Sequence, residues 1–497
     1  MTTSTRGEIT IVPFPGHGHV FPATELAHRL ASLNYHITLL LPFSTSSSPS
    51  STPLLHPLIH IVESDATPEP HHHHDRSSPL RDLLTKRTDG RDPSSLPLCV
   101  IVDVMMRREL EICKEFSIPA VSFFTSSACS TAFDHATRKI SLDDLSSREI
   151  LTVPGLPDDI SITLSDLAPR RPPPPRGGHP PPPPPFGPIH HHGVPPPGGS
   201  HALTPRPPPR GGHPPGPPAQ SGHPLPSGPP PPPGLEQTDG TIALLFNTCD
   251  DLERPFIEYI AKETKRPVWA VGPLLPARFW EASLGSSVMI HDDEIRPTRD
   301  SSFSEMEIIQ WLDSKPRGSV IYVSFGTVVG LGEDELAELA AGLEESNRPF
   351  IWVLHAGSET SRELARQAGD RGLVVEGWAP QLLILSHEST GGFISHCGWN
   401  STVEAIGLGV PMLTWPVHGD QVYNAKLVTS RLKTGYPVAD GSGVTKDHVV
   451  QGIERLMMDF EMRTRAASLR AIFKDGFPRS SSASLETFLD FLSTKLM

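Results

Sequence analysis

The sequence lacks several features that would each point to a particular class of protein. No apolar run approaches the length of about 18 residues that a membrane-spanning helix needs. The N-terminus from Met1 to Glu8 is polar and does not resemble a signal peptide. Lys and Arg number 42 against 56 Asp and Glu, and the resulting net charge of −14 argues against a nucleic-acid-binding surface.

Cysteine is also scarce, with five residues in a chain of 497. They are odd in number, scattered, and without the spacing of a metal site: Cys99, Cys113, Cys129, Cys249 and Cys397. This pattern favours reduced thiols, and so we expect a cytoplasmic protein.

Proline, in contrast, is abundant and is concentrated in one tract between residues 170 and 234. That tract holds about half of the 57 prolines and repeats the motif PRGGHPP at Pro175–Pro181 and Pro209–Pro215. Such a composition can form neither a helix nor a central strand and has little to bury, so we predict a disordered or polyproline II insertion. The histidine runs His71–His74 and His190–His192 could contact metal, but low-complexity sequence beside prolines is the simpler interpretation.

Outside this tract, apolar runs of strand length alternate with helical periodicity, which predicts an α/β fold with parallel, doubly wound sheets. The length suits two domains and an extra segment. The expected strands in the first half are 8–15, 35–42, 98–104, 119–126, 241–249 and 267–274, with helices at 22–33 and 252–263. The second half shows strands at 319–325, 350–354, 373–375, 390–397 and 411–416, with helices at 333–345, 401–407 and 484–495.

The turn from Cys397 to Asn400 is the first candidate site. It joins the strand Thr390–Cys397 to the short helix that starts at Ser401. Gly398 lets the backbone approach closely and turn sharply, and Asn400 or Ser401 is a good helix cap. Bare N–H groups at a helix start bind anions, so a diphosphate placed here would meet the helix end, the Ser401 hydroxyl and the imidazole of His396.

Four flanking residues complete a nucleotide-sugar pattern. Glu404, one turn into the helix, would face outward, and its carboxylate suits a neutral ribose diol better than a phosphate. Trp378 offers a flat ring to a base. Asp420 and Gln421 place an acceptor and an amide side by side, as a sugar's vicinal hydroxyls require. Each residue alone could equally be a cap or core residue, whereas the combination is specific.

The segment Trp378–Gln421 resembles the signature box of plant family 1 UDP-sugar glycosyltransferases. The resemblance implies a GT-B fold, in which two Rossmann-like domains face each other across a cleft. It implies an acceptor domain at 1–275, a linker at 276–304, a UDP-sugar domain at 305–475, and a C-terminal helix at 476–497 that packs back on the first domain. The implied donor contacts are Trp378 and Ala379 for uracil; Gln381 and Glu404 for ribose; His396, Gly398, Trp399, Asn400 and Ser401 for phosphate; and Asp420 and Gln421 for hexose. Gln421 at the last position implies a preference for glucose.

The same resemblance identifies a catalytic pair in the first half. Either His17 or His19 could serve in the glycine turn after the first strand, and the family pattern selects Gly18-His19-Val20 with Pro22. Asp103 is the only charge in the run LCVIVDV and matches the Asp that orients the catalytic His. Two hydroxyls, Thr125 near the sugar and Thr327 near phosphate, carry over by position.

We therefore expect an inverting glucosyltransferase that moves glucose from UDP-glucose to a hydroxyl of a small plant aglycone, such as a flavonoid or another phenolic. A hormone or terpenoid acceptor is an alternative. No Asp-x-Asp pair is present to hold a metal on the diphosphate, so we expect no cofactor beyond the UDP-glucose co-substrate. A UDP-sugar sensor without catalysis and a proline-rich scaffold for SH3- or WW-type domains stay open as other classes. We expect a monomer.

Overall fold

The computed structural model describes residues 5–41, 56–63, 78–89, 96–140, 151–163, 234–276, 279–280, 301–326, 330–354, 369–439 and 443–496. The proline-rich tract, most of the expected linker, the two histidine runs and Thr327 lie outside these residues.

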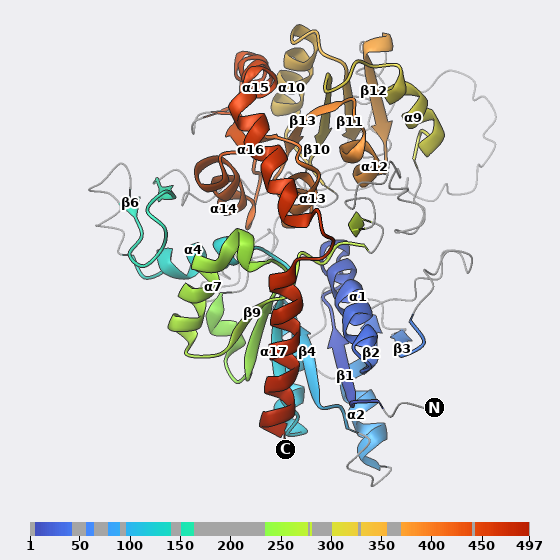
Figure 1. The fold of residues 1–497 in the computed structure, drawn as a ribbon, viewed down its shortest axis with the longest axis vertical. Helices are drawn as coiled ribbons and strands as arrows, with labels where there is room; N and C mark the ends of the chain where they lie inside the picture. Colours follow the sequence, from blue (N-terminus) through green and yellow to red (C-terminus); the bar gives the residue numbers. More distant parts are fainter. Residues whose placement is uncertain are drawn as a thin grey trace, which may run out of the picture. The chain divides into compact units, whose positions relative to one another are not determined.

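The first half of the chain forms a seven-stranded parallel sheet in the order β3-β2-β1-β4-β5-β8-β9 (Figure 1). Its strands are β1 (Glu8–Val12), β2 (His36–Leu41), β3 (Ile59–Glu63), β4 (Cys99–Asp103), β5 (Ala120–Phe124), β8 (Ala243–Phe246) and β9 (Val268–Ala270). Four of them carry almost uninterrupted buried aliphatic and aromatic residues, because helices cover both faces of a parallel sheet.

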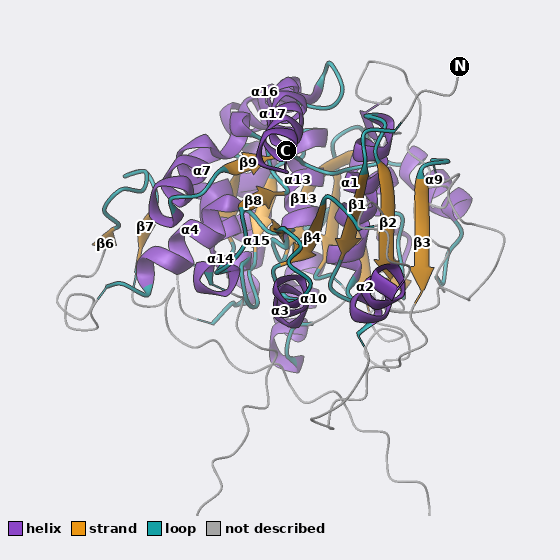
Figure 2. Ribbon diagram, turned by 90° about the horizontal axis from the view of Figure 1, so that it is seen from below, coloured by secondary structure: helices purple, strands orange, loops and turns teal. Residues whose placement is uncertain are grey.

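Two layers of helices bury this sheet (Figure 2). On one face, α1 (His17–Ser32) packs Leu26 and Leu30 against β1 and β2, together with Phe488 of the C-terminal helix α17 (Arg479–Leu496). On the other face, α2 (Pro79–Asp89) and α3 (Arg107–Glu115) supply Leu84 and Leu110. α4 (Ala128–Thr137) and α7 (Asp250–Thr264) follow β5 and β8 and pack against each other.

The second half forms a six-stranded parallel sheet in the order β12-β11-β10-β13-β14-β15. Its strands are β10 (Val320–Ser324), β11 (Phe350–Leu354), β12 (Gly372–Glu376), β13 (Thr390–Ser395), β14 (Met412–Thr414) and β15 (Gly435–Pro437). One face is covered by α9 (Glu305–Asp313), α12 (Gln381–Ser386), α13 (Trp399–Leu408) and α14 (Gln421–Lys426), and the other by α10 (Glu333–Glu345) and α15 (Lys446–Met458).

The remaining elements are short or lie outside the two sheets. They are β6 (Leu151–Thr152), β7 (Ser161–Ile162), η2 (Leu235–Thr238), η3 (Gly369–Arg371), the π-helical η4 (Leu427–Leu432), α16 (Phe460–Arg470) and η5 (Ala471–Phe473). Among the described helices, none is both long enough and apolar enough to span a membrane.

The C-terminal helix α17 belongs to the core of the first sheet. Leu485, Phe488, Leu489 and Leu492 are all buried there, at spacings that line one side of a helix. Figure 1 shows α17 beside β9, which the chain formed more than 200 residues earlier. The end of the chain thus stabilises a sheet that its beginning builds.

The fold class expected from the sequence is confirmed, with two parallel α/β sheets, and the predicted strand bounds are mostly too wide. β1 ends at Val12 instead of Pro15, and β5 ends at Phe124 instead of Ser126. In both places the residues beyond the strand form the connection to a helix, and their backbone is no longer part of the hydrogen-bonded ladder.

Candidate active site

Each sheet has one position where the strand order reverses. In the first sheet the chain proceeds outward from β1 to β3 and then returns to β4 on the other side of β1. In the second, β11 and β12 lie on one side of β10, and β13 lies on the other. Ligands of open α/β sheets bind beyond the carboxyl ends of the strands at such positions. His19 and Asp103 follow β1 and end β4, and the turn at Cys397 follows β13, so the predicted residues gather at both reversals.

His19 and Asp103 form a hydrogen-bonded pair. Helix α1 begins at His17, directly after the extended Gly16, and this start places His19 in the first helical turn. Its Nδ1 lies 2.8 Å from Oδ2 of Asp103. Because a carboxylate only accepts, Nδ1 carries the hydrogen and Nε2 keeps its lone pair. The other Asp103 oxygen accepts the backbone N–H of Met105, so the carboxylate is fixed on both sides.

The surroundings of this pair set its basicity. Burial lowers the pKa of His19, but the hydrogen bond to Asp103, the Asp103 charge and the charge of Asp420 outweigh it, so the His19 pKa is raised above its usual 6.5. The Asp103 side chain is fully buried, whereas that of His19 is 28% exposed. An accessible imidazole held by a buried carboxylate is suited to take a proton from a bound molecule.

Two further side chains contact the His19 ring. The Thr125 hydroxyl lies 3.0 Å from the same Nδ1, so its oxygen and Oδ2 of Asp103 both face the hydrogen on Nδ1. Phe14 presents its ring at 5.1 Å between centroids and 65° to the imidazole, in an edge arrangement. Thr125 was expected near the sugar, whereas no role was predicted for Phe14. Its position two residues after β1, as a large aromatic side chain in a turn of prolines and glycines that also holds His17 and His19, was the available signal.

The β13–α13 turn differs from the prediction in how it is made. The prediction that Asn400 or Ser401 caps the helix is wrong, because α13 starts at Trp399 with Gly398 as the N-cap, and no side chain caps it. The sharp turn is made by Cys397, at φ +63°, while Gly398 has an ordinary φ of −57°. The backbone N–H groups of the first turn therefore lack a side-chain acceptor, as an anion site requires.

Glycine is required at two positions because of His396. A Cβ at Gly398 would lie 2.5 Å from Nε2 of His396, and a Cβ at Gly326 would lie 2.8 Å from the same atom. The imidazole is thus wedged between the ends of β10 and β13. Burial, and then the neighbouring His418, lower the pKa of His396 to about 4, so the ring is neutral at pH 7. It can offer one N–H to a phosphate without bringing a charge of its own.

Gln381 connects two of the residues expected at the donor. Its Nε2 donates to the Ser401 hydroxyl at 3.0 Å and to Oε2 of Glu404 at 2.7 Å, and its Oε1 accepts from Tyr322 at 3.3 Å. Glu404 is only 1% exposed, so the expectation that it faces outward is wrong. Since a buried carboxylate needs hydrogen-bond donors, Gln381 satisfies Glu404 from the neighbouring helix α12.

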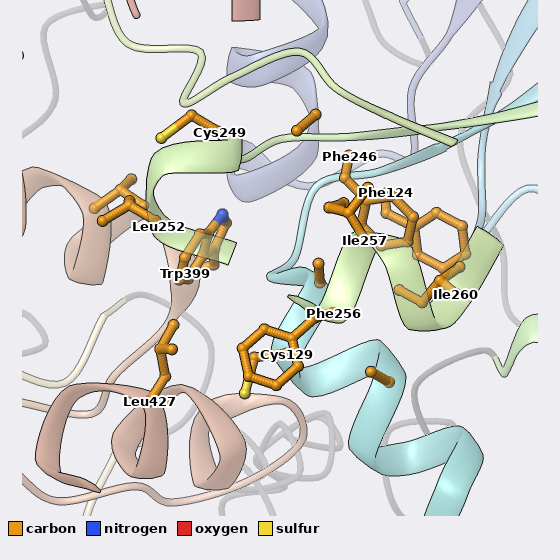
Figure 3. Close-up of a cluster of buried hydrophobic side chains, with 14 of the residues drawn as sticks. Phe124, Cys129, Phe246, Cys249, Leu252, Phe256, Ile257, Ile260, Trp399 and Leu427 are labelled. Atoms are coloured by element: carbon orange, nitrogen blue, oxygen red, sulfur yellow. The ribbon is translucent and has the colours of Figure 1, made fainter. Parts of the chain in front are cut away.

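Trp399 lies with its indole in the core. It is 3% exposed and its Nε1 donates to the backbone carbonyl of Asn247 at 2.6 Å. Figure 3 shows the ring in the same buried cluster as Cys249 and Leu252 of the first half of the chain. Only the backbone N–H of Trp399 is therefore left for the predicted phosphate contact.

Asp420 and Gln421 precede and begin helix α14. Burial raises the pKa of Asp420, although Asn424 donates to its Oδ2 at 2.9 Å. Gln421 is 4% exposed, and its Oε1 accepts the backbone N–H groups of Val417 and His418 at 2.8 and 2.9 Å. Its amide oxygen is thus occupied in closing the loop before α14. Its Nε2, which also lies 3.3 Å from Nε2 of His418, is the atom that can donate to a sugar hydroxyl.

The other predicted donor residues border this group. Trp378 is half-buried directly after β12, and Ala379 beside it is buried. Asn400 donates from Nδ2 to the carbonyl of Gly18 at 3.3 Å, one residue before His19. Thr327 follows β10 but lies outside the described residues. The described part of the chain holds no cluster of three or more His, Cys, Asp or Glu that could bind a metal ion.

Comparison with known proteins agrees with this geometry. Residues 283–478 match the family model of UDP-glucoronosyl and UDP-glucosyl transferases. Scopoletin glucosyltransferase of Nicotiana tabacum is 37% identical over 277 residues, which cover 52% of this chain and 56% of that protein. UDP-glycosyltransferase 73B1 of Arabidopsis thaliana is 35% identical over 50% of this chain and 51% of its own length, so the chain spans about half the length of these relatives. Abscisate beta-glucosyltransferase of Phaseolus angularis is 28% identical over 99% of this chain and 98% of its own.

Solved structures share the fold along nearly the whole chain. Phytolacca americana UGT2, complexed with UDP-2fluoro-glucose and pterostilbene, superposes with a TM-score of 0.67 at 24% identity and covers 98% of this chain and 100% of its own. A Polygonum tinctorium UDP-glucosyltransferase capable of glucosylating indoxyl gives a TM-score of 0.69 at 24% identity, over 99% of this chain and 100% of its own. In its match to the family model over residues 283–478 and in its curated relatives, this chain is similar to plant UDP-glycosyltransferases.

Proposed function

We propose that this protein is an inverting glucosyltransferase that transfers glucose from UDP-glucose to a hydroxyl of a small plant aglycone. The observation that carries the proposal is the hydrogen-bonded pair His19–Asp103, which lies at the strand-order reversal of the first sheet. The charge of Asp420, in the second half of the chain, also raises the pKa of His19. A protein that only binds a UDP-sugar needs no buried carboxylate to raise the basicity of an accessible imidazole.

The reaction is a single displacement. Nε2 of His19 takes the proton of the acceptor hydroxyl as the oxygen forms a bond to the anomeric carbon. The bond from that carbon to the β-phosphate oxygen breaks on the opposite face, and its electron pair leaves with UDP. Asp103 accepts from Nδ1 throughout and stabilises the imidazolium that forms. No covalent glycosyl-enzyme intermediate arises, so the anomeric configuration inverts.

The departing UDP gains negative charge, and the second sheet offers neutral donors for it. The uncapped first turn of α13 presents backbone N–H groups, and the wedged His396 presents an imidazole N–H. Preorganised donors of this kind stabilise developing charge without reorganisation. They would supply the stabilisation that a divalent cation gives in other transferases, and we propose that no metal is required.

A phenolic acceptor, such as a flavonoid, fits the residues around His19. The Phe14 ring stands edge-on to the imidazole and provides an aromatic surface within reach of the proton acceptor. The relatives' names support a small aromatic or hormone-like acceptor: scopoletin, abscisate and zeatin are named for glucosyltransferases similar to this chain. All five cysteines are buried and unpaired, which suits the cytosol we propose as its compartment.

The test is a mass-resolved assay with UDP-glucose and a panel of flavonoids, coumarins, stilbenes, plant hormones and terpenoid alcohols, with EDTA present. We expect a mass increase of one hexose on at least one phenolic. Proton NMR of the product should show a β-linked glucose, since UDP-glucose is α-linked. Binding of UDP without turnover on any acceptor would favour the sensor, and an α-linked product would contradict the single displacement.

A further inference from the structure

One buried side chain connects the donor turn, Asp420 and the first half of the chain, and no predicted role accounts for it. Asn424 on α14 is fully buried. Its Nδ2 donates to the carbonyl of Cys397 at 2.9 Å and to Oδ2 of Asp420 at 2.9 Å. Its Oδ1 accepts from the Ser127 hydroxyl at 2.5 Å.

The chemistry of its partners fixes the orientation of this amide. A backbone carbonyl and a carboxylate can only accept, so the NH₂ group must face Cys397 and Asp420. With the amide turned over, three oxygens would meet without a hydrogen between them. The hydroxyl of Ser127 is then left to donate to Oδ1, which it can do while its oxygen accepts the backbone N–H of Ser130 at 2.9 Å as the N-cap of α4.

The contact with Cys397 controls the strained turn. Among the residues that the structure describes, Cys397 is one of six non-glycine residues with positive φ, a conformation that needs support from its surroundings. Because the peptide between Cys397 and Gly398 is planar and trans, holding the Cys397 carbonyl aims the Gly398 N–H to the opposite side. That N–H sits at the start of α13, where the phosphate is expected.

The contact with Ser127 leads to the catalytic pair. Ser127 is fully buried and lies two residues after Thr125, whose hydroxyl is 3.0 Å from Nδ1 of His19. Asp420, whose carboxylate accepts from Asn424, is close enough for its charge to raise the pKa of His19. A single amide thus contacts elements from both halves of the chain.

We propose that Asn424 is a positioning residue that fixes the phosphate-binding turn and Asp420 relative to His19, an inference that rests on the proposed function. Loss of its two N–H donors should disturb the turn and Asp420 together. Loss of its bond to Ser127 should leave the turn intact but release α14 from α4. Loss of the two N–H donors and loss of the bond to Ser127 should therefore have different kinetic effects.

The first experiment uses N424D, which keeps the shape and the acceptor for Ser127 but replaces the two donors by an oxygen. The control is N247D, at an amide that is 1% exposed and whose Oδ1, accepting from the Leu274 N–H at 2.6 Å, is likewise retained. Calorimetric titration with UDP and steady-state kinetics are measured for both at a temperature where both are folded by circular dichroism. We expect the UDP Kd to rise at least tenfold and kcat to fall at least tenfold in N424D, with the Kd of N247D within twofold of wild type.

The second variant, S127A, leaves both donors of Asn424 in place. We expect its UDP Kd to stay within twofold of wild type while kcat falls at least threefold, and this variant serves alone where N424D does not fold. Wild-type Kd and kcat in N424D, an equal rise of Kd in N247D, or an unchanged kcat in S127A would each overturn the inference. Failure of the wild-type protein to bind UDP would instead overturn the proposed function on which it rests.

Discussion

His19 combines two requirements that oppose each other at the scale of a single residue. It must lie in a partly closed site, and burial disfavours the imidazolium that forms when it takes a proton. The buried Asp103 compensates through a hydrogen bond of 2.8 Å and through its charge. The resulting pKa above 6.5 means that the neutral, reactive form dominates only above that pKa, in the range where a base is also strong enough to help.

This balance predicts the pH dependence of the reaction. In the wild-type protein, kcat/KM for the acceptor should rise with pH through a pKa above 6.5 and then level off, because protonated His19 cannot accept a proton. In Asp103→Asn, burial is opposed only by the charge of Asp420, so the pKa of His19 falls and the rising limb should move to lower pH. The plateau should drop by about 10²- to 10⁴-fold, because an amide that donates to Nδ1 leaves the hydrogen on Nε2. The pH profiles of both proteins, with UDP affinity as the control, check this, and a limb that stays in place would contradict the pairing.

Gly398 permits a test of the anion turn that removes no functional group. Its φ of −57° suits any residue, so Gly398→Ala adds no backbone strain, but the new Cβ would lie 2.5 Å from Nε2 of His396. Displacing the wedged imidazole should cost about 1 to 3 kcal/mol, or roughly 5- to 150-fold in UDP affinity. Gly443→Ala makes the same change where nothing lies within 4 Å and serves as the control. Equal UDP Kd values for the two variants would show that His396 does not contribute to the site.

Sequence patterns identified residues whose chemistry contrasts with their neighbours, and missed those defined by contacts. Asp103 could be found because it is the only charge in a buried run, and the structure places it at the end of β4 against His19. Asn424 could not be found, because its three partners come from parts of the chain up to 297 residues away. The burial of Glu404 was missed for the same reason, since the amide that satisfies it belongs to another helix.

At the scale of elements, a carboxylate of α7 accepts hydrogen bonds from the start of α4. Helix α7 is kinked at Glu253, whose φ of −133° and ψ of 17° lie outside the helical range. The kink turns Glu253 to the start of α4, where its two oxygens accept the backbone N–H groups of Ala128 and Cys129 at 3.0 and 2.7 Å. Burial nonetheless raises the pKa of Glu253 to about 7, because these donors only partly replace water.

A raised carboxyl pKa makes the folded protein bind a proton that the unfolded chain releases. The Glu253 contribution to stability therefore falls as pH rises from about 4.5, its unfolded value, to about 7. Glu253→Gln has no proton to lose, so its stability relative to wild type should improve over that interval, by up to about 3 kcal/mol. Denaturant unfolding of both proteins at pH 5 and pH 8 measures the difference. A difference that is the same at both pH values would show that Glu253 titrates as it does in water.

The element boundaries show where local patterns suffice. The predicted bounds of β11 and α10 are those of the structure. β11 is a continuous apolar run, α10 has apolar residues at helical spacing, and both have clear ends in the sequence. The turns at the carboxyl ends of β1 and β13 were placed less well. There the backbone follows contacts such as the wedge of His396, which no local propensity encodes.

At the scale of the whole molecule, the proline-rich tract separates two segments that are both firmly packed. Ile160 and Ile162 before it are 0 and 1% exposed, and Leu235 and Thr238 after it are 3 and 0% exposed. Arg266 donates to the carbonyl and hydroxyl of Thr238 and so fixes the second segment to the chain before β9. The segments that flank the tract are thus part of the folded first half of the chain.

Deletion of residues 177–233 tests how far the rest of the protein is independent of this tract. Shortening a loop changes its closure entropy with the logarithm of its length, on the order of 1 kcal/mol here when the linker 164–176 remains. Joining Arg176 to Gly234 should therefore leave the thermal midpoint and the KM for UDP-glucose nearly unchanged, since the described residues that we expect to contact UDP all lie between β10 and α14. Because the tract lies within the expected acceptor domain 1–275, its deletion should raise the KM for bulky phenolics or broaden the acceptor range. Measuring both KM values and the unfolding curve separates these cases, because a loss of donor affinity or of cooperative unfolding would mean that the tract is part of the folded core.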